Sequence, residues 1–206
     1  MRTKPLFLTI AHRLAILAYI AFALFPLYWL LKVAVTPNDL LYSEGIRMWP
    51  SRASLEHFDF VLRHSAFPVF FKNSLIVSGS TAVIVTILAS LSGYALSRFN
   101  FRGKYWLVAL MLLTQMFPLV MLVAPIFKIL SPMGLTNSLT GLVIVYTAFN
   151  VPFATFLMQS FFDGIPKDLE EAAMIDGATQ FVAFRQIILP LTLPGVAATL
   201  GFAIGM

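Results

Sequence analysis

The stretch that decides the fold class lies between residues 139 and 162 and reads LTGLVIVYTAFNVPFATFLMQSFF. It contains no Asp, Glu, Lys or Arg side chain. A helix needs about 20 predominantly apolar residues to cross the hydrocarbon core of a membrane, and this stretch provides that length without a charge. The sequence therefore predicts a membrane-spanning helix here.

Charge-poor stretches of similar length recur along the chain, and a turn-like segment at 131–138 (SPMGLTNS) separates two of them. We therefore expect an all-α fold, a polytopic transmembrane helix bundle. The single transmembrane domain would cover residues 14–206, after a cytoplasmic N-terminus at 1–13. The predicted spans are residues 14–35, 73–97, 105–129, 139–162 and, as a partial fifth span, 187–206.

The composition supports a membrane protein and excludes several other classes. Of 206 residues, 59% are hydrophobic and only 11% are charged, whereas about 25% of the residues in a typical soluble domain are charged. The chain has no cysteine, which excludes thiol catalysis and cysteine-ligated metals. In such a chain the net charge of +5 is a signal of membrane topology, and we expect no nucleic-acid partner.

Lysine and arginine in the short loops predict the orientation in the membrane. Residues 98–104 (RFNFRGK) contain three cations, and the N-terminus carries Arg2, Lys4 and Arg13, whereas the loop 131–138 has none. Because cations concentrate in cytoplasmic loops, we expect the N-terminus to be cytoplasmic. The loop at 163–190 would then be cytoplasmic too.

The predicted spans contain three deep polar side chains, Gln115, Asn150 and Gln159. Such groups usually face the bundle or a wet cavity, so they are candidates for helix packing or for a solute path. Prolines inside the spans are expected to kink their helices. These prolines are Pro26, Pro118, Pro125 and Pro152.

No catalytic or metal-binding constellation is recognisable. The three histidines lack metal-ligand spacing, and there is no Gly-x-x-x-x-Gly-Lys-[Ser/Thr] phosphate loop. No carboxylate, histidine pair or arginine lies in the middle of a span, which argues against an ion-coupled secondary transporter and an intramembrane enzyme. If the protein uses ATP, another chain must bind it.

The loop from Asp163 to Pro190, hereafter the EAA loop, contains five of the nine acidic residues of the chain. Acids after Pro166 suit the first turn of a helix. Gly177 is suited to a left-handed helix end, and a second short helix is expected from about Thr179 until Pro190 ends it, with Phe181 on the same side as Phe184. Two short helices joined at a glycine would present an acidic surface to a basic groove of a soluble partner.

Residues 171–178 (EAAMIDGA), followed by Phe184 and Leu189-Pro190, closely resemble the EAA motif of ABC importer permeases. The segments 93–99 (GYALSRF), 114–118 (TQMFP) and 161–166 (FFDGIP) are similar to the carbohydrate-importer, MalG-like branch of that family. The resemblance implies a MetI-like type I importer permease with six spans. Only four complete spans and part of a fifth are present, so we expect the sequence to be a fragment.

The resemblance also implies function and partners. The chain would be the permease subunit of an importer for a sugar or sugar-like solute, in the inner membrane of a bacterium. It would pair with a second, MalF-like permease, two ATPase subunits that bind ATP and magnesium, and an extracytoplasmic solute-binding protein. The chain itself would bind no cofactor or metal and would not be an enzyme. The resemblance assigns docking to the ATPase to Glu170, Glu171, Ala172, Ala173, Asp176, Gly177, Ala178, Phe184 and Pro190.

Two alternative functions remain open at this point. Glycerol phosphate and polyol permeases share the architecture, so the solute could belong to these classes. An ATP-independent channel or secondary transporter is a more distant alternative.

Overall fold

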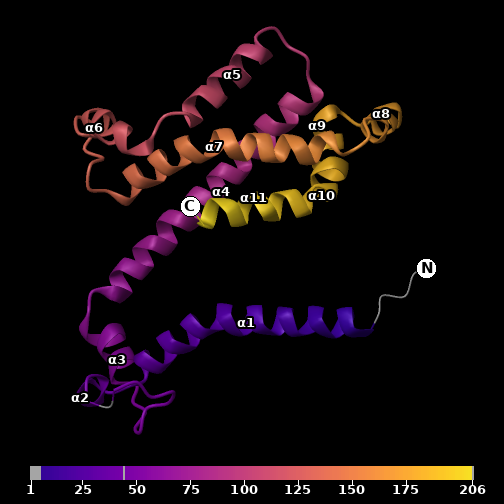
Figure 1. The fold of residues 1–206 in the computed structure, drawn as a ribbon. Coiled ribbons are helices and arrows are strands. Elements are labelled where there is room, and N and C mark those ends of the chain that lie inside the picture. Colours follow the sequence, from indigo (N-terminus) through magenta and orange to yellow (C-terminus); the bar gives the residue numbers. More distant parts are fainter. Residues whose placement is uncertain (1–5, 44, 206) are drawn as a thin grey trace. The chain divides into compact units, whose positions relative to one another are not determined.

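The computed structural model describes residues 6–43 and 45–205, and every regular element in these ranges is helical (Figure 1). This confirms the predicted all-α class. The chain divides into two compact units, Met1–Phe71 and Lys72–Met206. The single domain predicted for residues 14–206 stays a prediction.

The first unit is built on one long helix, α1 (Leu6–Ala34), which contains Pro26. Its apolar part, Ile10–Ala34, is long enough to span a membrane. Short helical segments follow before the chain enters α4. They are α2 (Asn38–Leu41), α3 (Glu56–Asp59) and the π-helical turn η1 (Phe60–His64).

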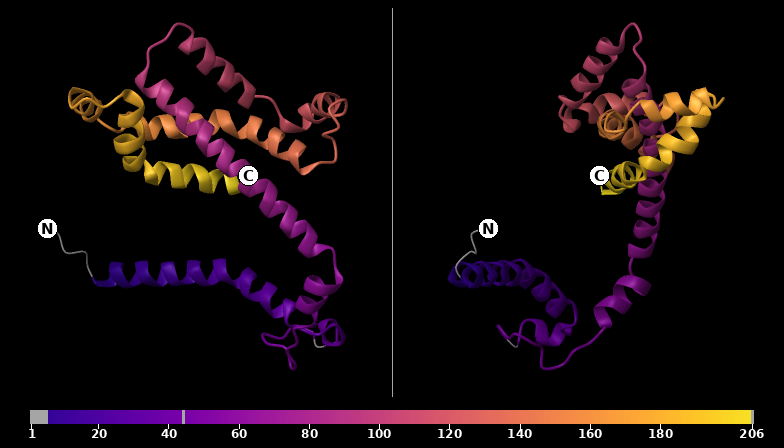
Figure 2. Two further views of the ribbon diagram at one scale, coloured as in Figure 1. Left: turned by 180° about the vertical axis from the view of Figure 1, so that it is seen from behind. Right: turned by 90° about the vertical axis from the view of Figure 1, so that its right-hand side faces the viewer.

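The second unit contains most of the buried side chains, and Figure 2 shows its helices from two further directions. Helix α4 (Phe67–Arg98) leads into it from the first unit. The following helices are α5 (Lys104–Gln115), α6 (Leu119–Leu130), α7 (Leu139–Asp163), α8 (Asp168–Ile175), α9 (Gln180–Ala183), the π-helical turn η2 (Phe184–Ile188), α10 (Leu189–Leu191) and α11 (Leu193–Gly205).

Helices α4 and α7 approach closely because a glycine lies at their contact. A Cβ atom on Gly93 would lie 2.9 Å from the backbone nitrogen of Gln159 and 2.9 Å from the Cβ of Met158. Beside this contact, the hydroxyl groups of Ser92 and Thr155 are 2.7 Å apart and share a hydrogen bond. Small side chains and short polar bridges of this kind replace the hydrophobic effect as the packing force within lipid.

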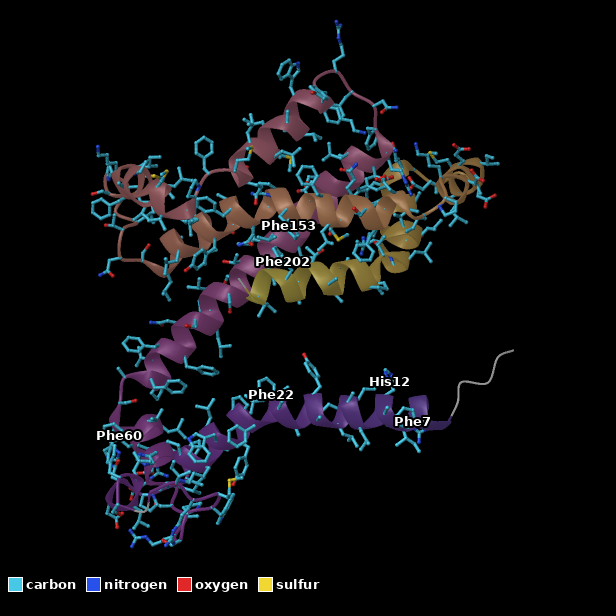
Figure 3. All side chains as sticks on the ribbon, viewed as in Figure 1. Phe7, His12, Phe22, Phe60, Phe153 and Phe202 are labelled. Carbon is cyan, nitrogen blue, oxygen red and sulfur yellow. The ribbon has the colours of Figure 1, made fainter. Side chains whose placement is uncertain are left out.

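Helix α11 packs along α7 in the opposite chain direction. The rings of Phe153 and Phe202 lie side by side (Figure 3), with their centroids 4.5 Å apart. Toward the other end of α7, a Cβ atom on Gly195 would come within 2.5 Å of the Phe161 ring. The two helices therefore touch through an aromatic pair at one level and a glycine at another.

The structure differs from the sequence prediction at two spans. Among the described residues, three helices are long and apolar enough to span a membrane, and the number rises to five if each of two bent helix pairs is one span. The predicted span 105–129 is one of these pairs, because α5 and α6 meet at 103°. Pro118 has an extended backbone (ψ 126°), lacks an amide hydrogen and disfavours helix at Phe117. At Pro118 the sequence predicted only a kink, whereas in the structure the helix is interrupted there.

The last predicted span, 187–206, is also bent. The helical segment Gln180–Leu191 meets Leu193–Gly205 at 74°, so residues 187–191 belong to the end of the EAA loop. The helical segment ends at Leu191, one residue after Pro190, where the sequence predicted the end of the loop's second helix.

Candidate functional site: the EAA loop

The EAA loop is folded along its length. Its first helix, α8, ends in a paired hydrogen-bond arrangement in which the amide of Gly177 donates to the Met174 carbonyl (3.1 Å) and that of Ala178 donates to the Ala173 carbonyl (3.0 Å). This is the Schellman motif, which requires a left-handed residue at the turn. Gly177 has φ +89°, so the predicted left-handed glycine is confirmed.

The second part of the loop begins at a side-chain cap. The hydroxyl of Thr179 accepts a hydrogen bond from the amide of Val182 (3.4 Å), which satisfies one of the free donors of α9. The chain then passes through η2 and α10 into α11 without an intervening loop. The EAA loop is thus continuous with α7 at one end and with α11 at the other.

A buried ion pair fastens α8 to the end of α4. The carboxylate of Glu170 accepts hydrogen bonds from the Arg98 guanidinium through Oε1 and from the Tyr94 hydroxyl through Oε2, the latter at 2.7 Å. The same guanidinium donates to the Ile165 carbonyl at 3.0 Å, and next to it Ser97 donates to Asp163 at 2.5 Å. Charged, hydrogen-bonded contacts of this kind fix geometry better than neutral ones.

An aromatic cluster lies directly beneath the ion pair. The ring of Tyr94 is 4.5 Å from that of Phe184 and 5.7 Å from that of Phe162, centroid to centroid. Phe162 and Ile188 are fully buried in the same core. The cluster brings together α4, the end of α7 and η2, so the base of the EAA loop is part of the hydrophobic core.

This arrangement corrects the sequence prediction for three of the proposed docking residues. Glu170, Ala173 and Phe184 are each less than one-tenth exposed, because they face the core and the Arg98 guanidinium. We therefore reassign them from docking to anchoring the loop. The sequence also placed Phe181 with Phe184, but Phe181 is 65% exposed. Since η2 is a wider π-helical turn, the α-helical spacing does not continue through it.

The other predicted docking residues lie on the outer side of the loop. Glu171, Ala172, Asp176, Gly177 and Pro190 are not buried, and Ala178 is half-buried. Apolar side chains that the prediction did not include accompany them: Ile175 is 85% exposed, and Met174 and Phe181 are exposed as well. The outer side therefore combines acidic and apolar groups, and we call Glu171, Ala172, Ile175, Asp176 and Phe181 the outer face of the EAA loop.

The three polar residues predicted inside the spans do not form one site. Gln115 donates a hydrogen bond to the Phe149 carbonyl (3.3 Å), next in sequence to the buried Asn150, whose amide donates to the Tyr146 carbonyl (2.8 Å). Gln159 instead contacts Asp163 near the other end of α7, at 3.5 Å. The Asn150 Oδ1 atom is buried without a partner. A role in a solute path stays a prediction.

Sequence reasoning missed Tyr94 and Arg98 as site residues. Both lie in the segment 93–99 that resembles the family, and Arg98 was counted as a cation of the 98–104 loop, but neither was given a role in a site. A guanidinium at the last residue of an apolar span was a signal that it needs an anion nearby. Within residues 6–43 and 45–205, no group of three or more His, Asp or Glu side chains is placed to hold a metal ion.

These features define a multi-pass helical membrane protein in which the loop between two apolar helices is folded and tied to the bundle. Residues 85–206, more than half of the chain, match the family described as binding-protein-dependent transport system inner membrane component. The chain belongs to this family.

Relatives agree with this assignment. The chain is 36% identical over 177 residues to the trehalose transport system permease protein SugB of Mycobacterium tuberculosis, an alignment that covers 86% of this chain and 64% of SugB. It is 34% identical over 175 residues to the diacetylchitobiose uptake system permease protein DasC of Streptomyces coelicolor, covering 85% and 63%. The chain thus spans less than two thirds of the length of these relatives.

A solved structure shows the same fold. It is described as a bacterial ABC transporter involved in the import of the acidic polysaccharide alginate, and one of its chains superposes with a TM-score of 0.85 at 20% identity. The superposition covers 99% of this chain and 72% of that chain. The MetI-like permease fold implied by the sequence is therefore confirmed.

Proposed function

We propose that this chain acts as a permease subunit of an ATP-driven importer for a sugar or sugar-like solute. Family membership and the names of the relatives support this class of protein. The observation that carries the proposal is the EAA loop, which is folded, anchored by the Arg98–Glu170 pair and yet presents an acidic and apolar outer face.

The outer face suits a soluble partner with a basic and apolar groove. Glu171 would pair with a cation of the groove, and the exposed Ile175 and Phe181 side chains would fill its apolar part. Aromatic and large aliphatic anchors at the centre of a contact usually carry most of its binding energy. In our proposal the partner is an ATPase subunit, which binds ATP and magnesium, so that this chain needs no cofactor of its own.

The anchoring gives a mechanical reason for coupling. A displacement of α8 would be transmitted to α4 through the contact between the Glu170 carboxylate and the Arg98 guanidinium. It also reaches α7 and α11, because the EAA loop is continuous with both. Packed helices with fixed contacts move as bodies, so closure of an ATPase dimer would tilt the spans between two states. A solvated, unstructured loop would absorb the same displacement.

The full importer requires partners that the proposal names by role. They are a second, MalF-like permease, two ATPase subunits and an extracytoplasmic solute-binding protein. The apolar span of α1, Ile10–Ala34, would contact lipid or the second permease. The cations at residues 98–104 support an orientation in which the N-terminus and the EAA loop face the cytoplasm.

Co-purification with the cognate ATPase subunit tests the docking assignment. Glu171→Lys reverses an exposed charge on the outer face and should abolish association, whereas its thermal unfolding should match that of the wild type. The matched control is Arg102→Glu, an equally large charge reversal at an exposed site in the 98–104 loop, which should keep the ATPase bound. Wild-type ATPase binding and transport by Glu171→Lys would overturn the assignment.

A further inference from the structure

The chain between α1 and α4 contains an amphipathic segment. The apolar residues recur three and four positions apart: Leu55 just before α3, then Phe58, Val61 and Leu62 within α3 and η1. Their exposed fractions are 69, 43, 37 and 57%. We call these four exposed residues the apolar stripe.

The same segment carries exposed charged side chains. Arg63 Nε lies 3.0 Å from Asp59 Oδ1, and both side chains are exposed. His64 Nδ1 is 3.9 Å from the other oxygen of Asp59, and its ring stacks on that of Phe60, which is 61% exposed. The segment therefore combines exposed apolar side chains with an exposed ion pair over about two helical turns, a combination found in helices that lie in a membrane–water interface.

The beginning of the segment is fastened to the end of α1. The amide of Ser54 donates to the Val35 carbonyl at 2.8 Å, and His57 Nε2 lies 2.9 Å from the Thr36 carbonyl oxygen. The amide of Asn38 donates to the Glu56 carboxylate at 2.9 Å. The apolar span of α1 ends at Ala34, so these hydrogen bonds hold α3 within a few residues of a membrane-spanning helix, as Figure 1 shows.

The end of the segment is equally close to a second span. Helix η1 ends at His64 and α4 begins at Phe67, and three Cα–Cα steps reach at most about 11 Å. The first turns of α4 expose the aromatic rings of Phe67, Phe70 and Phe71. The apolar stripe is thus held between the ends of two membrane-spanning helices, and this surface continues into theirs.

We propose that α3 and η1 lie along the membrane–water interface, with the apolar stripe inserted among lipid chains and with Asp59 and Arg63 facing water. We expect lipid to contact the stripe because it lies directly between two membrane-spanning helices. The helical segment has only nine residues and is about 14 Å long, so it stays close to the membrane surface from which these two helices emerge. Trp49 and Tyr42 are also exposed in this region, and such rings favour the interface. The proposal does not depend on the transported solute or on the ATPase.

An interfacial segment at this place would set the tilt of α4. This helix has 32 residues and is therefore about 48 Å long, whereas the hydrocarbon core is only about 30 Å thick. A helix of that length must either tilt or project from the membrane. Interfacial anchors are among the contacts that determine whether it tilts or projects.

The absence of cysteine from the sequence allows a direct test. Single variants Leu62→Cys on the stripe and Arg63→Cys beside it on the polar side are labelled with bimane in the otherwise unchanged chain. Each protein is reconstituted into phosphatidylcholine vesicles with and without bromine atoms on the upper part of the acyl chains, and the bimane emission is compared.

We expect brominated lipid to lower the emission at residue 62 about twofold or more, because an interfacial helix buries its apolar face in the acyl boundary. Emission at residue 63 should change little. Equal and negligible quenching at both positions would overturn the proposal. Quenching at residue 62 that disappears when the solute-binding protein or the second permease is added would also overturn it, since the stripe would then be a protein contact.

Discussion

Arg98 and Glu170 form an ion pair in which each side chain is only 5% exposed, and this pair joins the last residue of α4 to the first turn of α8. The two residues are 72 positions apart in the chain. Because the Tyr94 hydroxyl donates to the second carboxylate oxygen, Glu170 has a partner on each oxygen. The EAA loop is therefore attached to the helix bundle at a third point besides its two chain ends.

Removing one partner of this pair should strongly destabilise the loop. Glu170→Gln leaves the Arg98 guanidinium buried without an anion, which typically costs about 3–5 kcal/mol. We expect a lower Tm of the purified protein and loss of ATPase binding, both measured in lipid nanodiscs. The double variant Arg98→Met with Glu170→Met removes both charges and should be more stable than either single variant. A Tm of Glu170→Gln equal to that of the wild type would contradict this anchoring role.

Gly177 should tolerate no side chain at the loop's turn. Its φ of +89° is a conformation that costs an L-residue about 1–2 kcal/mol, although a Cβ atom at this position would have no neighbouring atom within 4 Å. Gly177→Ala should therefore weaken the loop through backbone strain alone. Gly164→Ala is the matched control, since Gly164 has φ −73° and should accept alanine. Protease cleavage within the loop measures the effect, and equal cleavage of both variants would refute it.

Gly93 should be sensitive to substitution for a different reason. A Cβ atom there would lie 2.9 Å from the backbone of α7, and forcing helices apart typically costs about 1–3 kcal/mol. Gly93→Ala should lower the Tm of the protein. Gly79→Ala, in the same helix with nothing within 4 Å of its Cβ position, should leave the Tm unchanged or raise it, because alanine favours helix over glycine. The reverse order of these two Tm values would show that α4 and α7 do not meet at Gly93.

Ile175 should matter for partner binding and not for folding. Its side chain is 85% exposed at the end of α8, so Ile175→Ala removes little buried surface within the chain. If Ile175 is an apolar anchor of the docking contact, its truncation should weaken ATPase binding by about 1–3 kcal/mol, measured by titration of the ATPase onto the reconstituted permease. Leu191→Ala, which truncates another exposed side chain in the same loop region, should have no such effect. Equal affinities of the two variants would remove Ile175 from the docking face.

Local chemistry made much of the EAA loop predictable from the sequence. The left-handed Gly177 and the helix before it follow from rules that act over a few residues. These local rules could not predict that the side chain of Glu170 faces the core. Glu170 and Glu171 are neighbours on one helix turn, and which of them faces the core is decided by Arg98, far away in the sequence.

The same distinction applies to the spans. Their existence follows from apolar length, whereas the 103° bend between α5 and α6 does not. Pro118 indicates that the helix is disturbed, but the angle depends on how both pieces pack against the rest of the bundle. Similarly, the aromatic contact of Tyr94 with Phe184 joins segments whose proximity no local pattern encodes.

Uptake into proteoliposomes tests the central claim most directly, namely that the EAA loop couples this permease to ATP hydrolysis. The vesicles contain the complete permease pair and receive the solute-binding protein with the radiolabelled sugar that raises its Tm. We predict uptake only when wild-type ATPase subunits and ATP are both present, and none with Glu171→Lys. Equal uptake without the ATPase subunits, or with Glu171→Lys, would contradict the account.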